Sequence, residues 1–400
     1  MAPYFVEVGV SEGPATAATT EVSFRPVALS GATATFILAG MTASVFGPLL
    51  VTLSHRFHLS LPTAGEVLTV FAVGDFMGVL VGWLGVKRLP GGVVLSGDLV
   101  LLAAGATGAA LAHGWTVFLV FILLTGLGFG GLDFSLNTLL TRTREEGRAH
   151  RLSVVNAGFG VGAVLGPLLI IILHPRHFAT LLIAMAIAAV ILSTLNRGVH
   201  APALRAEPLQ LAISRMKSQR RPILLTFVVA YVLYIAVEAS ASGWMAAQLH
   251  GAGYSQTIGS VVTAGFWLGL AIGRTFGGAL NRRFTHVELV LGGLVVVAAL
   301  SLLCLSSPLA LVAYPLMGLA IATVFPMGLH WYTLLCPHDT DGLAMMILFM
   351  FVGGALGPGT ESLLVSAFSV HVVPLVIGAF ALVDAVVFAS ARRFSPIVLV

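Results

Sequence analysis

The stretch VGAVLGP, residues 161–167, returns almost unchanged as VGGALGP at residues 352–358. Other segments repeat at nearly the same separation. Gly74, Gly78 and Gly82, followed by Lys87-Arg88, correspond to Gly269, Gly273 and Gly277, followed by Arg282-Arg283. Gly126-Leu127 corresponds to Gly318-Leu319. Because these matches have similar separations of 191, 192 and 195 residues, we infer that the chain is a duplicated unit.

The composition of the chain indicates an integral membrane protein. Of its 400 residues, 58% are hydrophobic and 9% are charged, whereas soluble domains carry about 25% charged residues. The mean hydropathy is +1.01. The first residues lack a basic start followed by an apolar run, so they do not resemble a signal peptide.

Twelve apolar runs are long enough to cross a bilayer, which takes about 20 residues per helix. They are residues 27–53, 63–86, 92–112, 115–140, 152–173, 177–195, 222–248, 257–280, 287–305, 309–335, 343–368 and 372–391. We therefore expect an all-α membrane protein with 12 transmembrane helices in two pseudo-symmetric six-helix bundles.

The basic residues predict the orientation of these spans. All of the 20 Lys and Arg residues except Arg56, Arg176 and Arg274 fall on the side of the two termini. By the positive-inside rule, both termini are cytoplasmic, and the pI of 9.4 needs no nucleic-acid partner to explain it. We expect a multi-pass protein of the cytoplasmic membrane that acts as a monomer.

The polar stretch between the sixth and seventh spans divides the chain. The predicted organisation is a flexible cytoplasmic tail (1–26), an N-terminal bundle (27–195), a basic cytoplasmic linker (196–221), a C-terminal bundle (222–391) and a second cytoplasmic tail (392–400). Small residues four apart allow close backbone approach. The glycine ladders of spans 2, 5, 8 and 11 therefore predict an interface at which the two halves slide.

This pattern resembles the major facilitator superfamily over most of the chain. The segment GVLVGWLGVKR, residues 78–88, resembles the motif between spans 2 and 3 of that superfamily, with Gly82 where an aspartate is usual. The resemblance implies a charge latch formed by that motif, which the missing aspartate places in question. The segment GAVLGPLL only half-matches the span-5 motif of the antiporters.

Two segments resemble the fucose-permease-like branch of proton-linked sugar transporters. They are GLDFSLNTLL at residues 131–140 and YIAVEASASGWMAAQL at residues 234–249. The resemblance implies that Asp133 takes part in proton coupling. The span-1 aspartate of that branch is missing here, so coupling would use another group, such as Glu238 or Asp75.

Ionisable residues inside the spans are functional candidates, because a charge at the bilayer centre costs about 2.5–3.5 kcal/mol even on insertion scales. The proton-coupling candidates are Asp133, Glu238 and Asp75, each with a structural salt bridge as the alternative. The candidates for a charge network or gate are Arg274, Lys87, Arg88, Arg282, Arg283, Glu361 and Asp384, and Asp98 also lies within a span.

Aromatic and polar residues at mid-depth are candidates for binding the solute. They are Asn137, Asn156, Tyr231, Tyr234, Gln248, Trp267, His330 and Trp331. Aromatic rings can stack on the C–H faces of sugars while their polar atoms form hydrogen bonds. Packing, or an interfacial belt of Trp and Tyr, is the alternative. We predict no metal site, because the pairs His55/His58 and His174/His177 have no supporting carboxylate or Cys.

The chain carries no GxxxxGK[ST], HExxH or GxSxG motif, so neither ATP-driven transport nor these hydrolases are expected. We predict a secondary active transporter rather than an enzyme. It would work by alternating access and carry out proton-coupled symport of a small polar solute, with a sugar as the preferred solute and no cofactor besides the coupling ion. The alternative is a proton-driven efflux antiporter for lipophilic drugs or metabolites.

Overall fold

The structure of the protein is a computed structural model that describes residues 26–141, 148–196, 199, 221–337 and 339–394. Within these ranges, all regular secondary structure is helical. The predicted tail 1–26 and linker 196–221 lie almost entirely outside the described residues, as does most of the tail 392–400.

The helices follow the apolar runs of the sequence. They are α1 (Pro26–Phe57), α2 (Leu61–Arg88), α3 (Gly91–Leu111), α4 (Trp115–Leu140), α5 (Arg148–Leu173), α6 (Phe178–Asn196), α8 (Arg221–Gly251), α9 (Gln256–Leu280), α10 (His286–Leu303), α11 (Ser307–Ile321), α12 (Val324–Leu335), α13 (Thr340–Met350), α14 (Val352–Ala367) and α15 (Val373–Ala391). In the described part of the chain, twelve stretches are long and apolar enough to cross a membrane. This confirms the predicted all-α membrane fold.

Two predicted spans each consist of two helices. The run 309–335 is divided into α11 and α12 at Ala322 and Thr323, where Pro326 follows in the first turn of α12. Proline removes one backbone donor and its ring crowds the carbonyl four residues earlier, so a helix breaks there. The run 343–368 is divided at Phe351, just before the pair Gly353-Gly354, and paired small residues are a known cause of kinks.

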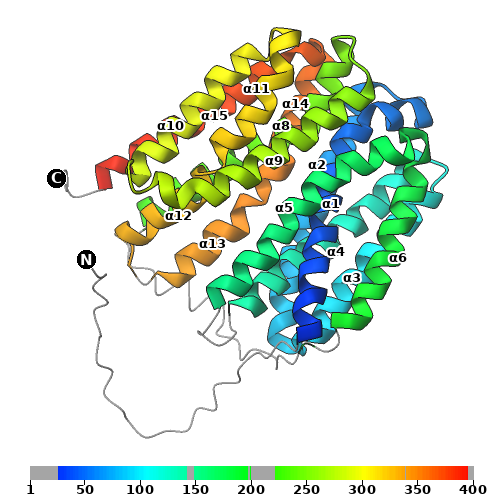
Figure 1. The fold of residues 1–400 in the computed structure, drawn as a ribbon, viewed down its shortest axis with the longest axis horizontal. Coiled ribbons are helices and arrows are strands. Elements are labelled where there is room, and N and C mark those ends of the chain that lie inside the picture. Colours follow the sequence, from blue (N-terminus) through cyan, green and yellow to red (C-terminus); the bar gives the residue numbers. More distant parts are fainter. Residues whose placement is uncertain (1–25, 142–147, 197–198, 200–220, 338, 395–400) are drawn as a thin grey trace, which may run out of the picture.

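Helices α1–α6 and helices α8–α15 form two groups that lie side by side (Figure 1). Across the boundary between the groups, α2 packs on α14, α5 on α9 and α1 on α8. Large apolar side chains remain exposed on the outside, among them Ile172, Leu363 and Val386. Such a surface suits lipid rather than water.

The glycine ladders pack within each group and not between the groups. A Cβ atom on Gly78 would overlap the carbonyl oxygen of Leu127 on α4, and one on Gly269 would overlap the carbonyl oxygen of Pro315 on α11. Gly357 of α14 likewise faces α8. The expectation that the ladder glycines form the sliding interface is therefore wrong, because they face helices of their own bundle. A close approach between the groups occurs instead at Gly47 of α1, where a Cβ atom would overlap the carbonyl oxygen of Ser242 on α8.

The groups are joined by hydrogen bonds near one end of the molecule. We call this the distal end. It carries the α1–α2 and α8–α9 connections, and it lies opposite the first residues of α1 and the last residues of α15. Gln256 donates from Nε2 to the carbonyl oxygen of Pro48 (2.7 Å) and to Thr52 Oγ1 (2.8 Å). Ser362 donates from Oγ to the carbonyl oxygen of Pro62 (2.6 Å). These bonds join the two groups of helices at the distal end.

Candidate functional site

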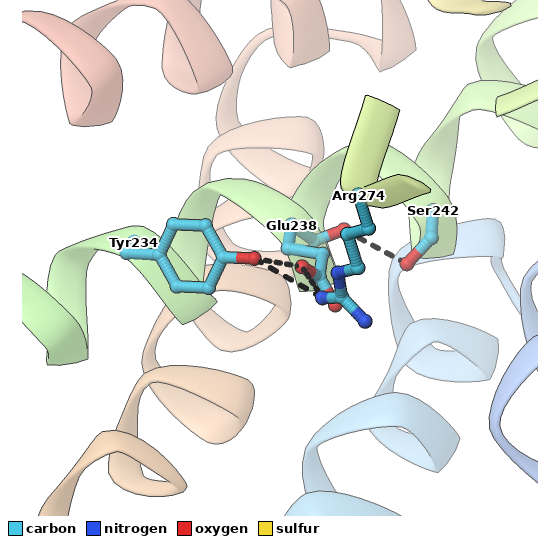
Figure 2. A network of polar contacts seen from close by, with 4 residues as sticks. All are labelled: Tyr234, Glu238, Ser242 and Arg274. Carbon is cyan, nitrogen blue, oxygen red and sulfur yellow. Dashed lines mark hydrogen bonds and ion pairs between the residues drawn. The ribbon is translucent and has the colours of Figure 1, made fainter. Parts of the chain in front are cut away.

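Glu238 is the centre of a polar cluster formed by two neighbouring helices (Figure 2). Tyr234, one turn earlier on α8, donates a hydrogen bond of 2.6 Å from its Oη to Glu238 Oε2. Arg274 of α9 places its Nη2 3.6 Å from the same oxygen and donates a hydrogen bond of 3.4 Å to Tyr234 Oη. We call Tyr234, Glu238 and Arg274 the Glu238 cluster.

Local structure holds the cluster in place. Positions four apart are stacked on one helix face, so Tyr234, Glu238 and Ser242 line the same side of α8. Ser242 donates from Oγ to the carbonyl oxygen of Glu238 at 2.8 Å. The ring of Tyr234 packs against Tyr231 and Phe325, with ring centroids 6.2 and 6.0 Å away. The phenol is therefore fixed in the position that reaches the carboxylate.

The cluster is accessible from one side. The side chain of Glu238 is 15% exposed and that of Arg274 is 40% exposed. Arg274 is thus the more exposed partner of the pair. The Glu238 carboxylate and the Arg274 guanidinium carry opposite charges and attract each other at this distance.

Asp133 and Asn137 form a second polar group, on α4. Asn137 donates from Nδ2 to the carbonyl oxygen of Asp133 (3.0 Å) and to its Oδ1 (3.2 Å), as their spacing predicts. Asp75 of α2 lies within electrostatic range of Asp133. Its Oδ1 is buried, with no hydrogen-bond partner among the described residues, and it lies close to Gly130. The first group of helices therefore holds two carboxyl groups near each other.

Tyr231 and Trp331 lie in the interior of the second group. Tyr231 donates from Oη to the carbonyl oxygen of Phe325 at 2.6 Å. The ring of Trp331 contacts Phe227 and Phe388 at centroid distances of 5.6 and 6.2 Å. Their burial indicates that these two residues pack inside the second group of helices.

Gln248 and Trp267 are also buried, at two different levels. Gln248 lies near the distal end and donates from Nε2 to the carbonyl oxygen of Cys304 at 3.3 Å. Trp267 of α9 meets Phe159 of α5 edge-on, with centroids 6.3 Å apart. Trp267 therefore forms part of the contact between the two groups of helices.

Asn156 and His330 are exposed and lie away from the Glu238 cluster along the chain. Asn156 donates from Nδ2 to the carbonyl oxygen of Leu152 at 2.9 Å. His330 contacts the ring of His286 at a centroid distance of 5.7 Å. Within the part of the chain that the structure describes, no group of three or more His, Cys, Asp or Glu residues could hold a metal ion.

The basic residues after the glycine ladders lie at helix ends. The Nζ of Lys87 sits 3.4 Å from the ring centroid of Trp83, a cation–π contact. The remaining basic candidates are exposed: Arg88, Arg282 and Arg283. Among the described residues no carboxylate pairs with these four, so a charge latch made by them stays a prediction.

The three remaining acidic residues are buried inside the helix bundles. Asp98 is 4% exposed, and Glu361 and Asp384 are 0% exposed. None of them forms an ion pair with another described residue. Neighbouring helices therefore enclose these three side chains, although the sequence places them nearer the ends of their spans.

Gln256 is a residue that the sequence did not single out. It stands at the start of α9, where a polar residue is ordinary. Its importance comes from its partner Thr52, which lies 204 positions away along the chain. The sequence carries no signal for such a pair.

A model of the Major Facilitator Superfamily matches residues 32–250, which is more than half of the chain. The chain belongs to this superfamily. It is a transporter rather than an enzyme, and a multi-pass membrane protein. The glucose/mannose transporter GlcP of Bacillus subtilis (strain 168) is 24% identical over 339 residues, which cover 80% of this chain and 84% of that protein.

Solved transporters share the fold. A point mutant of the peptide transporter POT aligns with a TM-score of 0.78 at 14% identity, covering 94% of this chain and 97% of that one. A point mutant of the E. coli fucose:proton symporter FucP aligns with a TM-score of 0.64 at 19% identity, covering 93% and 99%. The resemblance to the fucose-permease-like branch is confirmed at the level of the fold. Since these two structures belong to transporters of different solutes, the fold does not select the solute.

Proposed function

We propose that the protein carries out proton-coupled symport of a small polar solute, a sugar, by alternating access. The observation that carries the proposal is the Glu238 cluster. Its carboxylate is hydrogen-bonded by Tyr234, paired with Arg274 and only 15% exposed. A buried carboxylate in a membrane span marks a proton or ion pathway.

The geometry supports a specific coupling step. With Glu238 charged, the hydroxyl of Tyr234 and the guanidinium of Arg274 are both directed at one oxygen, Oε2. When Glu238 takes up a proton, Arg274 loses its counter-charge and becomes free to donate to solute hydroxyl groups. Proton binding and solute binding then favour each other, which is the thermodynamic requirement for symport.

The sugar assignment is supported by the similarity to GlcP, a glucose/mannose transporter, and by the kinds of polar groups present. Arg274 offers donors from the second group of helices, and Asp133 and Asn137 offer acceptors and donors from the first. A polyol needs both kinds of partner. We propose Asp133 and Asp75 as additional sites for the coupling proton.

The proposed orientation follows from the basic residues of the sequence. The termini lie in the cytoplasm, so the distal end faces outward. The bonds of Gln256 and Ser362 then close the outer side, and the solute reaches the Glu238 cluster from the cytoplasm in this state.

One observation keeps the efflux antiporter as the second candidate. Phe46, Phe71 and Phe129 form a run of ring contacts through α1, α2 and α4, with centroids 5.2 and 5.3 Å apart. Phe71 lies one turn before Asp75 on α2. A carboxylate beside such an apolar run suits a lipophilic cation better than a sugar.

Purified protein in liposomes distinguishes the two candidates. A pH step is imposed, and uptake of labelled glucose, mannose, fucose and xylose is measured beside a lipophilic cation, tetraphenylphosphonium. We expect at least one sugar to accumulate when the outside is acid, and protein-free liposomes serve as the control. Extrusion of the cation with no movement of any sugar would reject symport in favour of the antiporter.

A further inference from the structure

Glu361 of α14 is a buried acid that the coupling step does not use. It is 0% exposed, and both carboxyl oxygens, Oε1 and Oε2, have no hydrogen-bond partner among the residues that the structure describes. A charged carboxylate in such a place costs several kcal/mol unless something neutralises it. The interior around Glu361 therefore needs a positive charge or a proton.

Two hydroxyl groups from other helices stand near Glu361. The Ser240 hydroxyl of α8 lies beside the Glu361 carboxyl group, and Tyr314 of α11 lies within electrostatic range of it. Both residues are 0% exposed, and neither hydroxyl has a hydrogen-bond partner among the described residues. Gly357, one turn before Glu361, brings α14 close to α8, since a Cβ atom there would lie 2.7 Å from Ser240 Oγ.

The hydroxyl of Ser240 differs from several other buried hydroxyls of the chain, because it makes no hydrogen bond to the backbone of its own helix. Thr42, Thr226 and Thr263 each donate to the carbonyl oxygen four residues earlier, at 2.8 to 2.9 Å, as hydroxyls in membrane helices commonly do. Ser240 makes no such bond. Its oxygen therefore remains available to a ligand.

We propose that Glu361 and Ser240, with Tyr314 nearby, form a binding site for one monovalent cation, either a sodium ion or a proton. Carboxylate and hydroxyl oxygens are the donors that hard cations prefer. A single charge balances the single carboxylate, whereas a divalent ion would leave a net positive charge in the interior.

This site is separate from the Glu238 cluster. Ser240 and Glu238 are two positions apart on α8, and a helix turns about 200° over two residues. Ser240 therefore faces the interior of the second group of helices, while Glu238 faces Arg274. Occupancy of the Glu361 site does not depend on the solute or on the proposed coupling step.

Equilibrium binding of ²²Na⁺ to the purified full chain, without solute, tests the sodium form. We expect saturable binding near one ion per chain, at least 10-fold weaker in Glu361→Gln and weakened in Ser240→Ala. Asp384→Asn is the matched control, because Asp384 is an equally buried acid outside this group of hydroxyls. Both Asp384→Asn and Glu238→Gln should bind sodium like the wild type, which separates this proposal from the proposed function.

The proton form is tested by infrared spectroscopy on the same samples. If sodium does not bind, the wild type should show the carbonyl stretch of a buried protonated acid, which shifts when Ser240→Ala alters its surroundings and is missing in Glu361→Gln. The Ser240 variant keeps the test valid if Glu361→Gln does not fold. Sodium binding that is unchanged in both variants, or the lack of both sodium binding and the acid band, would overturn the proposal.

Discussion

Tyr234 Oη and Glu238 Oε2 are 2.6 Å apart on one face of α8, and the same phenol oxygen accepts a hydrogen bond of 3.4 Å from Arg274. Tyr234 thus bridges an acid and a base on different helices. In the proposed mechanism, the phenol connects the group that takes up the proton to the group that binds the solute.

Removing this hydroxyl should slow coupled transport. In Tyr234→Phe, the ring keeps its packing but Glu238 loses a hydrogen bond to a charged group, worth about 1.5–3 kcal/mol. We expect the initial rate of pH-driven sugar uptake to fall at least about 10-fold, since about 1.4 kcal/mol corresponds to a factor of ten. Tyr254→Phe, the same chemical change near the distal end, should leave the rate unchanged. Equal rates in the two variants would show that the bridge plays no part.

The interaction between Glu238 and Arg274 should give a measurable coupling energy in a double-mutant cycle of stability. Glu238→Gln and Arg274→Gln each leave one partner without its counter-charge, whereas the double variant leaves none. Because Arg274 is 40% exposed, the coupling should be modest, about 1 kcal/mol. Melting temperatures of the four purified proteins form the cycle. Strictly additive shifts would mean that the pair does not interact in the membrane protein.

The contact between α2 and α4 should tolerate no added methyl group. In Gly78→Ala, the new Cβ would overlap the carbonyl oxygen of Leu127, so we expect a loss of about 1–3 kcal/mol, seen as a lower melting temperature. Gly97→Ala of α3 is the matched control, because nothing lies within 4 Å of a Cβ there. A melting temperature that falls equally in both variants would contradict the close approach.

Breaking the distal bonds should open that end. Gln256→Ala removes the hydrogen bonds to Pro48 and Thr52, each worth about 0.5–1.5 kcal/mol, and should move the conformational equilibrium roughly 10-fold toward the distal-open state. Spin labels at His55 and Ile258 would report the longer distance by pulsed electron paramagnetic resonance. The native cysteines Cys304 and Cys336 are buried.

The control for this measurement is Thr257→Ala, which changes the neighbouring exposed residue and should keep the short distance. A distance distribution of Gln256→Ala identical to that of the control would mean that the bonds do not close the distal end.

Much of the fold was accessible from the sequence, because bilayer-spanning helices are set by hydrophobic length. Pro326 was a sign of a helix break in the sequence. The hydropathy of residues 309–335, however, predicted one continuous span where the structure has α11 and α12. The glycine ladder that includes Gly78 predicted a close helix contact, but the spacing of the glycines and the composition of the helix do not specify which helix lies opposite. The exposure of His330 depends on how α12 turns after its break, which no local pattern specifies.

The site was predictable only where its residues share a helix. The spacing of Tyr234 and Glu238, and that of Asp133 and Asn137, places each pair on one face. Arg274 comes from a separate helix, so its contact with Glu238 follows from the packing of α8 on α9. The lack of a charged partner for Glu361 among the described residues is likewise a property of the assembled bundle.

The most direct test of the account is pH-driven sugar accumulation by Glu238→Gln in liposomes, compared with sugar exchange at equal pH on both sides. Gln cannot take up the coupling proton, so accumulation should disappear while exchange continues at a measurable rate. Glu288→Gln, the same change at an exposed position of α10, should accumulate sugar like the wild type. If Glu238→Gln accumulates sugar to the wild-type level, Glu238 is not the coupling residue and the central claim is wrong.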